Sequence, residues 1–185
     1  MYQLTNLDNQ LRVLTVPMPN ARSVCAGVYL AVGSRYESEA ESGASHFIEH
    51  MLFKGTKTRR ARDIANIIES VGGYANAGTG REGTTYYCLM TPEHLPVALD
   101  LLSDMVLNAA FRRSEMERER GVIIEEINRT LDTPDDLVYE LIAALEWPES
   151  PVGRSIAGTH ATVTAMTRAD LLRFMKRHYR PNAAA

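Results

Sequence analysis

The order of the predicted segments constrains the fold most, because the first forty residues are predicted to form strands and the second half of the chain is predicted to be mainly helical. Residues 2–7 and 10–17 flank the turn-like pair Asp8-Asn9, which predicts a β-hairpin. Residues 23–34 and 74–90 are rich in β-branched, aromatic or small residues, which favours extended structure. Strands followed by helices are typical of an α+β domain.

The predicted helices share recognisable start and stop signals. They begin at Ser42 as an N-cap, Arg60, Thr91-Pro92, Ser114 with Glu117 as a capping box, Thr133-Pro134, and Thr167 with Asp170. The first is expected to end near Phe53, and the second at Val71 before a glycine pair.

Length and charge limit the classes of protein. A chain of 185 residues is long enough for one domain with a full core. Its net charge of −3 argues against capture of nucleic acid or of an anionic membrane. No apolar segment is long enough to cross a membrane, and the first residues lack the pattern of a signal peptide, so a cytoplasmic protein is expected.

The basic run 54–62 is interpreted as a solvated loop. Cys25 and Cys88 are expected to be buried free thiols.

The stretch "SHFIEH", residues 45–50, places two histidines and a glutamate within six positions. On a helix, His46, Glu49 and His50 share one face, because residues three and four apart are neighbours. The stretch is either a crowded surface patch or half of a metal site. A hydrolytic zinc site needs a third protein ligand. The remaining histidines, none of them paired with another candidate ligand at helical spacing, are His94, His160 and His178.

The segment 114–130 supplies better candidates for that third ligand. With Ile123 at the centre of the apolar face and 100° per residue, Glu119 and Glu126 fall at roughly −40° and −60°, inside the buried arc. Glu125 falls near 200° on the same wheel and therefore points away. A buried carboxylate needs a cation or a metal. An ion pair with an arginine of the same region, such as Arg120, is the alternative, but the histidine pair in the same chain favours the metal.

We therefore expect His46, His50 and Glu126 to bind zinc, with water as the fourth ligand. Glu49 is placed to take the proton of that water and pass it to the leaving amine. Glu119 is expected to assist catalysis by orienting a ligand.

These residues resemble a known family. "HFIEHMLFKGT" (46–56), followed by Glu119 and Glu126, is similar to the pitrilysin/insulinase family of zinc peptidases, whose H-x-x-E-H signature defines the inverzincins. Within it, the chain is most similar to mitochondrial processing peptidase and its bacterial relatives. The resemblance implies one Zn²⁺ per domain and the same roles for the site residues. It also implies a mixed, mainly antiparallel sheet with helices packed on one face.

A second motif, "NAGTGREGTTYY" (76–87), is similar to a family segment that forms an edge strand for substrate. The resemblance implies that Asn76 and Ala77 contact an extended peptide, a mode that depends on backbone hydrogen bonds. An ordinary turn and strand is the alternative. Gly78 and Gly80 depart from the family pattern, which has an aromatic residue and a serine there.

The resemblance covers essentially the whole chain and implies that residues 1–185 are an N-terminal-type zinc peptidase domain. Family members usually carry a second, C-terminal-type domain or subunit, which is absent here. The chain is expected to end within or just short of the first domain's last strands. A homomeric or heteromeric partner, or the missing domain, would then complete the substrate chamber.

The expected function is a zinc metalloendopeptidase that cleaves extended peptides or unfolded segments. A non-catalytic or partner-dependent subunit that acts in binding or assembly is the alternative from another class. A metal-free α+β binding domain with coincidental histidines is a weaker third interpretation.

Overall fold

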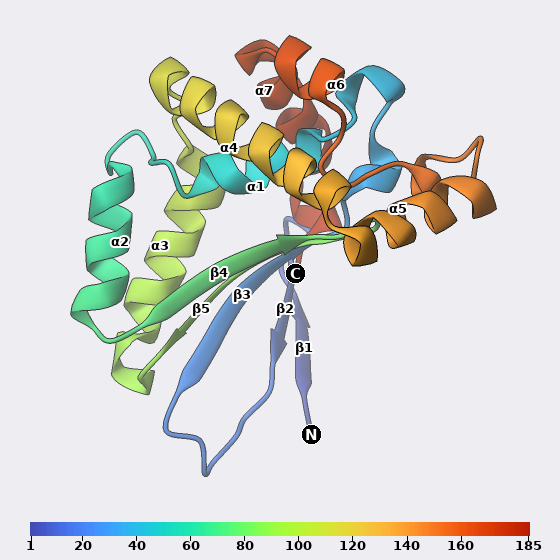
Figure 1. The fold of residues 1–185 in the computed structure, drawn as a ribbon. Helices are drawn as coiled ribbons and strands as arrows, with labels where there is room; N and C mark the ends of the chain where they lie inside the picture. Colours follow the sequence, from blue (N-terminus) through green and yellow to red (C-terminus); the bar gives the residue numbers. More distant parts are fainter.

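The computed structural model describes residues 1–185, beginning with the predicted hairpin. Strands β1 (Gln3–Asn6) and β2 (Arg12–Thr15) pair antiparallel. Gln10, in the connecting turn, takes a left-handed backbone with φ of 71°. All residues of both strands are exposed, and the hairpin lies apart from the helices (Figure 1).

A three-stranded sheet forms the centre of the fold (Figure 1). Its strands are β3 (Val24–Leu30), β4 (Tyr74–Thr79) and β5 (Thr84–Met90), in the order β3-β5-β4 and all antiparallel to their neighbours. The predicted α+β class with a mainly antiparallel sheet is therefore confirmed. β4 pairs with β5 alone, which leaves its other edge free within the sheet.

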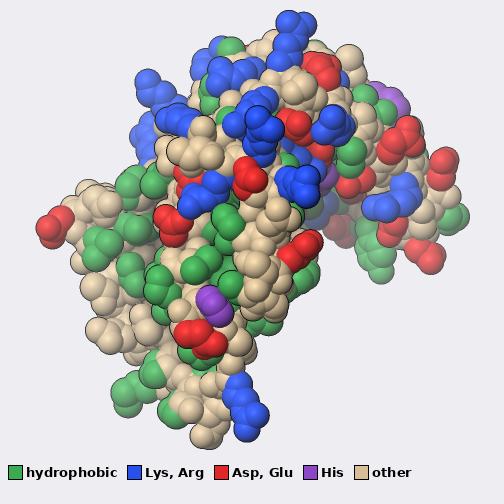
Figure 2. All heavy atoms as spheres, turned by 90° about the vertical axis from the view of Figure 1, so that its left-hand side faces the viewer, with side chains coloured by type: hydrophobic (Ala, Val, Ile, Leu, Met, Phe, Trp, Pro, Cys, Tyr) green, Lys and Arg blue, Asp and Glu red, His purple; other side chains and the backbone are tan.

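Seven α-helices accompany the sheet. They are α1 (Ala44–Leu52), α2 (Ala61–Ser70), α3 (Leu95–Asn108), α4 (Arg113–Asp132), α5 (Pro134–Glu146), α6 (His160–Ala165) and α7 (Arg168–His178). α3 packs against β3 and β5, α1 and α2 contact β4, and α4 crosses over α1 (Figure 1). Figure 2 shows Lys and Arg side chains gathered on the upper part of one face, at the height of α4 and α7 in Figure 1.

Side-chain alternation on β5 explains why the helices cover one face of the sheet. Tyr86 and Cys88 are fully buried in the core under the helices. On the opposite face, Tyr29, Tyr74 and Leu89 stay at least 41% exposed. Burial on one side and exposure on the other is the pattern expected of an antiparallel sheet with one packed face.

The start of α1 differs from the prediction. Gly43, not Ser42, precedes the helix, and it takes a left-handed backbone with φ of 94°. The side chain of Glu37 does the capping instead, because its carboxylate accepts hydrogen bonds from the backbone N–H groups of Gly43 (2.8 Å) and Ser45 (2.7 Å). The prediction of Ser42 as the N-cap was therefore wrong, because the side chain of Glu37, several residues before the helix, accepts the hydrogen bonds of its first N–H groups.

The predicted capping box at Ser114 was also wrong. α4 begins at Arg113, so Ser114 lies inside the first turn, and Arg112, two residues before Ser114, is at the N-cap position. The box formed by Thr167 and Asp170 is confirmed at the start of α7, with hydrogen bonds in both directions. The short helix α6 was not predicted.

The last residues extend the sheet. The N–H of Tyr29 donates to the carbonyl of Ala185 at 2.7 Å, and the N–H of Ala31 donates to the carbonyl of Ala183 at 2.8 Å. Residues 183–185 therefore lie antiparallel along the outer edge of β3.

Both cysteines are free thiols, as predicted, but only Cys88 is buried, whereas Cys25 is exposed on the uncovered face. None of the helices combines the length and the apolar composition needed to cross a bilayer.

Candidate metal centre

The short helix α1 brings both motif histidines to one side. Phe47, Ile48 and Met51 are almost completely buried and anchor the helix in the core. His46 and His50 lie one turn apart on the flank that faces α4, with ring centroids 4.6 Å from each other. The helix prediction for the "SHFIEH" stretch is confirmed.

Helix α4 presents its glutamates as the helical wheel predicts. Met116, Ile123 and Ile127 are buried along one side of the helix. The side chain of Glu119 is 4% exposed and that of Glu126 is 32% exposed, whereas Glu125 points to solvent.

Arg120 is not the cation partner of Glu119 or Glu126. It pairs with Glu117 and donates to the carbonyl of Met166 at 2.9 Å. An ion pair of Arg120 with Glu119 or Glu126, the alternative to a metal site, is therefore wrong.

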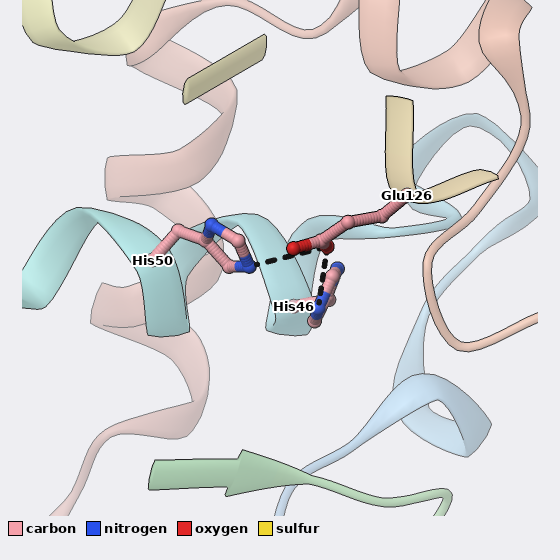
Figure 3. A group of neighbouring side chains, drawn as sticks. All are labelled: His46, His50 and Glu126. Carbon is pink, nitrogen blue, oxygen red and sulfur yellow. Dashed lines mark ion pairs between the residues drawn. The ribbon is translucent and has the colours of Figure 1, made fainter. Parts of the chain in front are cut away.

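The structure brings His46, His50 and Glu126 together (Figure 3). One donor atom from each lies within 4.8 Å of the others. Glu126 Oε2 lies 3.7 Å from His46 Nε2 and 3.5 Å from His50 Nε2. Two imidazoles and a carboxylate are a donor set that zinc prefers, and a zinc ion bonds each such atom at about 2.0–2.2 Å. A cluster of this size can close around one ion, so the residues fit the metal.

Burial prepares His46 for ligation. Burial, with a smaller contribution from the neighbouring His50, lowers the pKa of His46 to about 4, so the ring is neutral near pH 7. A neutral imidazole is the form that binds a metal. Nδ1 of His46 is buried without a hydrogen-bond partner. Its counterpart on His50 lies 3.2 Å from Glu119 Oε2.

Glu49 lies beside the cluster without belonging to it. The hydroxyl of Thr79, at the end of β4, donates a hydrogen bond to Glu49 Oε2. Burial raises the pKa of Glu49, and the Thr79 hydroxyl and His50 counteract that rise. Thr79 was missed as a site residue, although it stands inside the "NAGTGREGTTYY" motif that indicates a strand.

An open cavity of about 330 Å³ adjoins these side chains. Its wall includes His46, Glu49, Gly78, Thr79 and Glu126. A ligand in this space would therefore touch both the metal cluster and Glu49.

Neither Asn76 nor Ala77 lines that cavity. Both lie earlier on β4, where the side-chain oxygen of Asn76 accepts the N–H of Ala77 at 2.9 Å. The Asn76 amide also donates to the hydroxyl of Tyr74 at 2.7 Å. The predicted substrate contacts are therefore placed along the strand that leads into the cavity.

The sequence model of the family described as Insulinase (Peptidase family M16) matches residues 12–160, and this match includes every residue of the cluster. The chain belongs to the insulinase family of peptidases. The resemblance inferred from the H-x-x-E-H motif is thus confirmed.

Relatives of this insulinase-family chain carry zinc in their names. An uncharacterized zinc protease of Rickettsia bellii is 43% identical over 178 residues, which are 96% of this chain and 43% of the relative. The uncharacterized zinc protease YmxG of Bacillus subtilis is 38% identical over 175 residues, 95% of this chain and 43% of the relative. These names support zinc as the metal of the family.

Solved structures share the fold of the insulinase-family chain. A protease from Helicobacter pylori superposes with a TM-score of 0.95 at 28% identity, covering 100% of this chain and 45% of that one. Pitrilysin superposes with a TM-score of 0.89 at 27% identity, covering 100% of this chain and 20% of its own. The chain thus spans less than half the length of these relatives.

Proposed function

We propose that the chain is a zinc metalloendopeptidase domain that hydrolyses peptide bonds in extended peptides or unfolded segments. The observation that carries this proposal is the meeting of His46, His50 and Glu126 beside Glu49 in one open cavity. Three protein ligands with an accessible fourth position are typical of catalytic zinc, whereas structural zinc is closed by four.

His46, His50 and Glu126 would hold one zinc ion per domain. Zinc bound there would lower the pKa of a coordinated water toward neutrality and polarise the substrate carbonyl. Glu49 would take the proton of the attacking water and later give it to the leaving amine. Thr79 would keep the Glu49 carboxylate directed at the cavity through its hydrogen bond. Glu119 would hold the ring of His50 through Nδ1.

The free edge of β4 would receive the substrate. An extended peptide added to a strand edge gains backbone hydrogen bonds with little dependence on sequence. In the present structure the N–H of Ala77 is bonded to the side chain of Asn76, so substrate binding would exchange that contact for one with the peptide. The same strand continues to Gly78 and Thr79 in the cavity wall, which would lead the peptide to the metal centre.

Residues 1–185 would act as the N-terminal-type domain of a larger chamber, completed by a second domain or a partner chain. More than half the length of these relatives lies outside the matched region. Helix α5 supports a missing neighbour, because none of its residues is buried. Its exposed apolar residues are Val138, Tyr139, Leu141, Ile142 and Leu145. Exposed apolar patches of this kind mark contacts between proteins.

The competing function is a non-catalytic or partner-dependent subunit that acts in binding or assembly. The exposed apolar residues of α5 favour it, because such a surface marks a contact with another protein. The presence of the three candidate ligands and of Glu49 argues for catalysis, because a binding subunit has no need of a base beside the metal.

Cleavage of a fluorogenic, unstructured peptide tests the proposal. We expect cleavage by the purified chain, loss of cleavage with a chelator, and recovery when Zn²⁺ is restored. Glu49→Gln should retain zinc and lose at least about 100-fold in cleavage rate, since general acid–base catalysis contributes about 10²–10⁴-fold. Full zinc occupancy without cleavage by the unmodified chain would favour the subunit instead. Activity retained in Glu49→Gln would remove Glu49 as the base.

A further inference from the structure

Lys54, in the loop that follows α1, reaches the metal centre from outside. Its Nζ lies 2.9 Å from Glu119 Oε1. The other oxygen of that carboxylate, Oε2, lies 3.2 Å from Nδ1 of His50. Glu119 is 4% exposed and Lys54 is 31% exposed, so one buried carboxylate joins a solvent-reaching ammonium to a partly buried imidazole.

The carboxylate of Glu119 needs a positive partner because it is buried. Its ion pairs are with His50 and Lys54 alone. His50 cannot be that cation once it ligates a metal, because a ligating imidazole is neutral. Arg120, the nearest arginine along α4, is engaged with Glu117 and backbone carbonyls. Lys54 is therefore the one permanent cation that contacts Glu119.

We propose that Lys54 is a positioning residue of the metal centre: its ammonium neutralises and orients the buried Glu119 carboxylate, which then holds the Nδ1–H of His50 and leaves Nε2 for the metal. The hydrogen bond of one ring nitrogen decides which tautomer a histidine adopts and where its other nitrogen points. Nε2 of His50 is indeed the atom that faces Glu126, at 3.5 Å. This inference rests on the proposed function only in that the site binds zinc.

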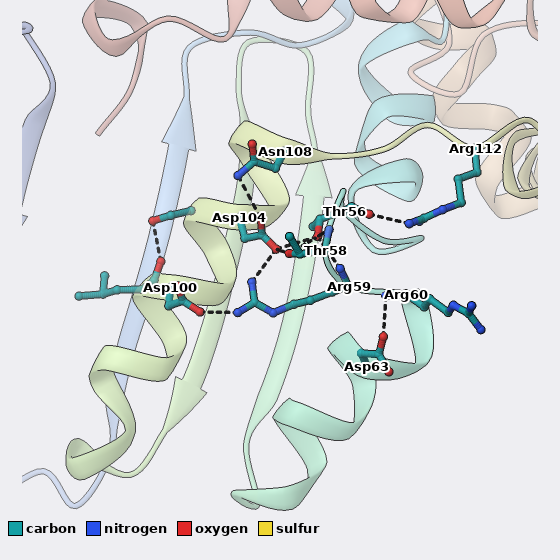
Figure 4. Close-up of polar contacts among 11 residues, drawn as sticks. Thr56, Thr58, Arg59, Arg60, Asp63, Asp100, Asp104, Asn108 and Arg112 are labelled. Carbon is teal, nitrogen blue, oxygen red and sulfur yellow. Dashed lines mark hydrogen bonds and ion pairs between the residues drawn. The ribbon is translucent and has the colours of Figure 1, made fainter.

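The loop that follows Lys54 is held in place at Thr56, whose contacts Figure 4 shows. Gly55 has a φ of 110°, a conformation that other residues rarely adopt, and its carbonyl accepts the N–H of Ala110 at 3.0 Å. The carbonyl of Thr56 accepts from Arg112 at 2.7 Å, and its hydroxyl donates to Asp104 at 2.7 Å. These contacts tie the residues after Lys54 to α3 and to the start of α4, and thus fix the point from which its side chain extends.

Zinc affinity, measured by competition with a chromophoric chelator, tests the proposal without reference to peptide cleavage. Lys54→Met should weaken zinc binding about tenfold, since loss of a partner that orients a ligand costs about 10–100-fold in affinity. Lys54→Arg should restore affinity to within about threefold, because the charge is kept. Lys57→Met, in the same loop but exposed and outside these ion pairs, is the matched control and should bind as the unmodified chain does. Equal affinities for Lys54→Met and Lys57→Met would overturn the proposal.

A double-mutant cycle separates positioning from general loss of structure. If Lys54 acts through Glu119, the effects of Lys54→Met and Glu119→Gln on zinc affinity should be far from additive, because the second substitution finds the contact already broken. Additive effects would contradict the proposal.

Nitrogen-15 spectra of the unmodified, zinc-loaded protein give a readout that needs no variant. They should show His50 protonated at Nδ1, and protonation at Nε2 would contradict the proposal. Because neither this measurement nor zinc affinity involves cleavage, a chain that fails as a peptidase would leave both results interpretable.

Discussion

At the residue scale, the proposed metal centre depends on how two glutamates of one helix are divided between solvent and the side that faces the histidines of α1. Glu125 and Glu126 are neighbours in sequence, yet only Glu126 reaches the histidines, because the buried Ile123 and Ile127 fix the rotation of α4. Periodicity alone gave this division, since the wheel centred on Ile123 places the two carboxylates on different sides.

Paired substitutions test that division. Glu126→Gln should weaken zinc binding by about 100-fold or more, because it removes a charged ligand. Loss of a residue that only orients a ligand already costs about 10–100-fold in metal affinity, and loss of the ligand itself should cost at least as much. Glu125→Gln makes the same chemical change at the neighbouring, solvent-facing position and should leave the zinc affinity unchanged. Competition with a chelator measures both. Equal losses in the two variants would contradict the assigned rotation of the helix.

At the element scale, the position of α1 depends on contacts that no local pattern reveals. Glu37 satisfies the first N–H groups of the helix from outside it, so the serine that looks like an N-cap is not needed. The basic run 54–62 was interpreted as a solvated loop, but Arg59 pairs with Asp100 and Asp104 of α3, and Lys54 reaches Glu119. Such partners are separated by many residues, so periodicity and spacing cannot find them, whereas strand alternation and helix faces follow from local sequence.

The buried Asp104 gives a pH-dependent prediction for this loop. Burial raises the pKa of Asp104, but hydrogen bonds from Thr56, Arg59 and Asn108 outweigh burial and hold it below its ordinary value of 3.8. The ionised carboxylate therefore stabilises the fold above pH 3.8, and this contribution is lost as the pH falls through the lowered pKa. Asp104→Asn should cost about 2 kcal/mol at pH 7, the range for hydrogen bonds to a charged group.

Urea unfolding at several pH values measures this effect. The difference in unfolding free energy between the unmodified chain and Asp104→Asn should shrink as the pH falls below 3.8. Asp100→Asn, whose side chain is 67% exposed, serves as the control and should change stability by less than about 0.5 kcal/mol. A difference for Asp104→Asn that stays constant with pH would show that the carboxylate charge is not involved.

At the scale of the whole molecule, the candidate metal centre joins two layers of the fold. His46 and His50 come from α1, which lies on the sheet, and Glu126 comes from α4, which crosses over α1 (Figure 1). The α+β class and the meeting of the two histidines with Glu126 could be predicted from the sequence. The placing of Asn76 and Ala77 outside the cavity could not, because the path of an edge strand depends on how the sheet packs.

Zinc should therefore stabilise the native state as a whole. A ligand that binds only the folded chain adds about 2.7 kcal/mol at a free concentration of 100 times its Kd. Chemical unfolding with buffered Zn²⁺ and with a chelator should show an increase of about that size, and Glu126→Gln should show little at the same Zn²⁺ concentration. An equal increase in both proteins would mean that zinc binds elsewhere.

The most direct test of the metal centre is an anomalous difference map collected at the zinc edge from crystals of the zinc-loaded protein. A single peak bonded to one nitrogen each of His46 and His50 and to the carboxylate of Glu126 is the predicted result. A zinc peak at other side chains, with these three residues free of metal, would contradict it.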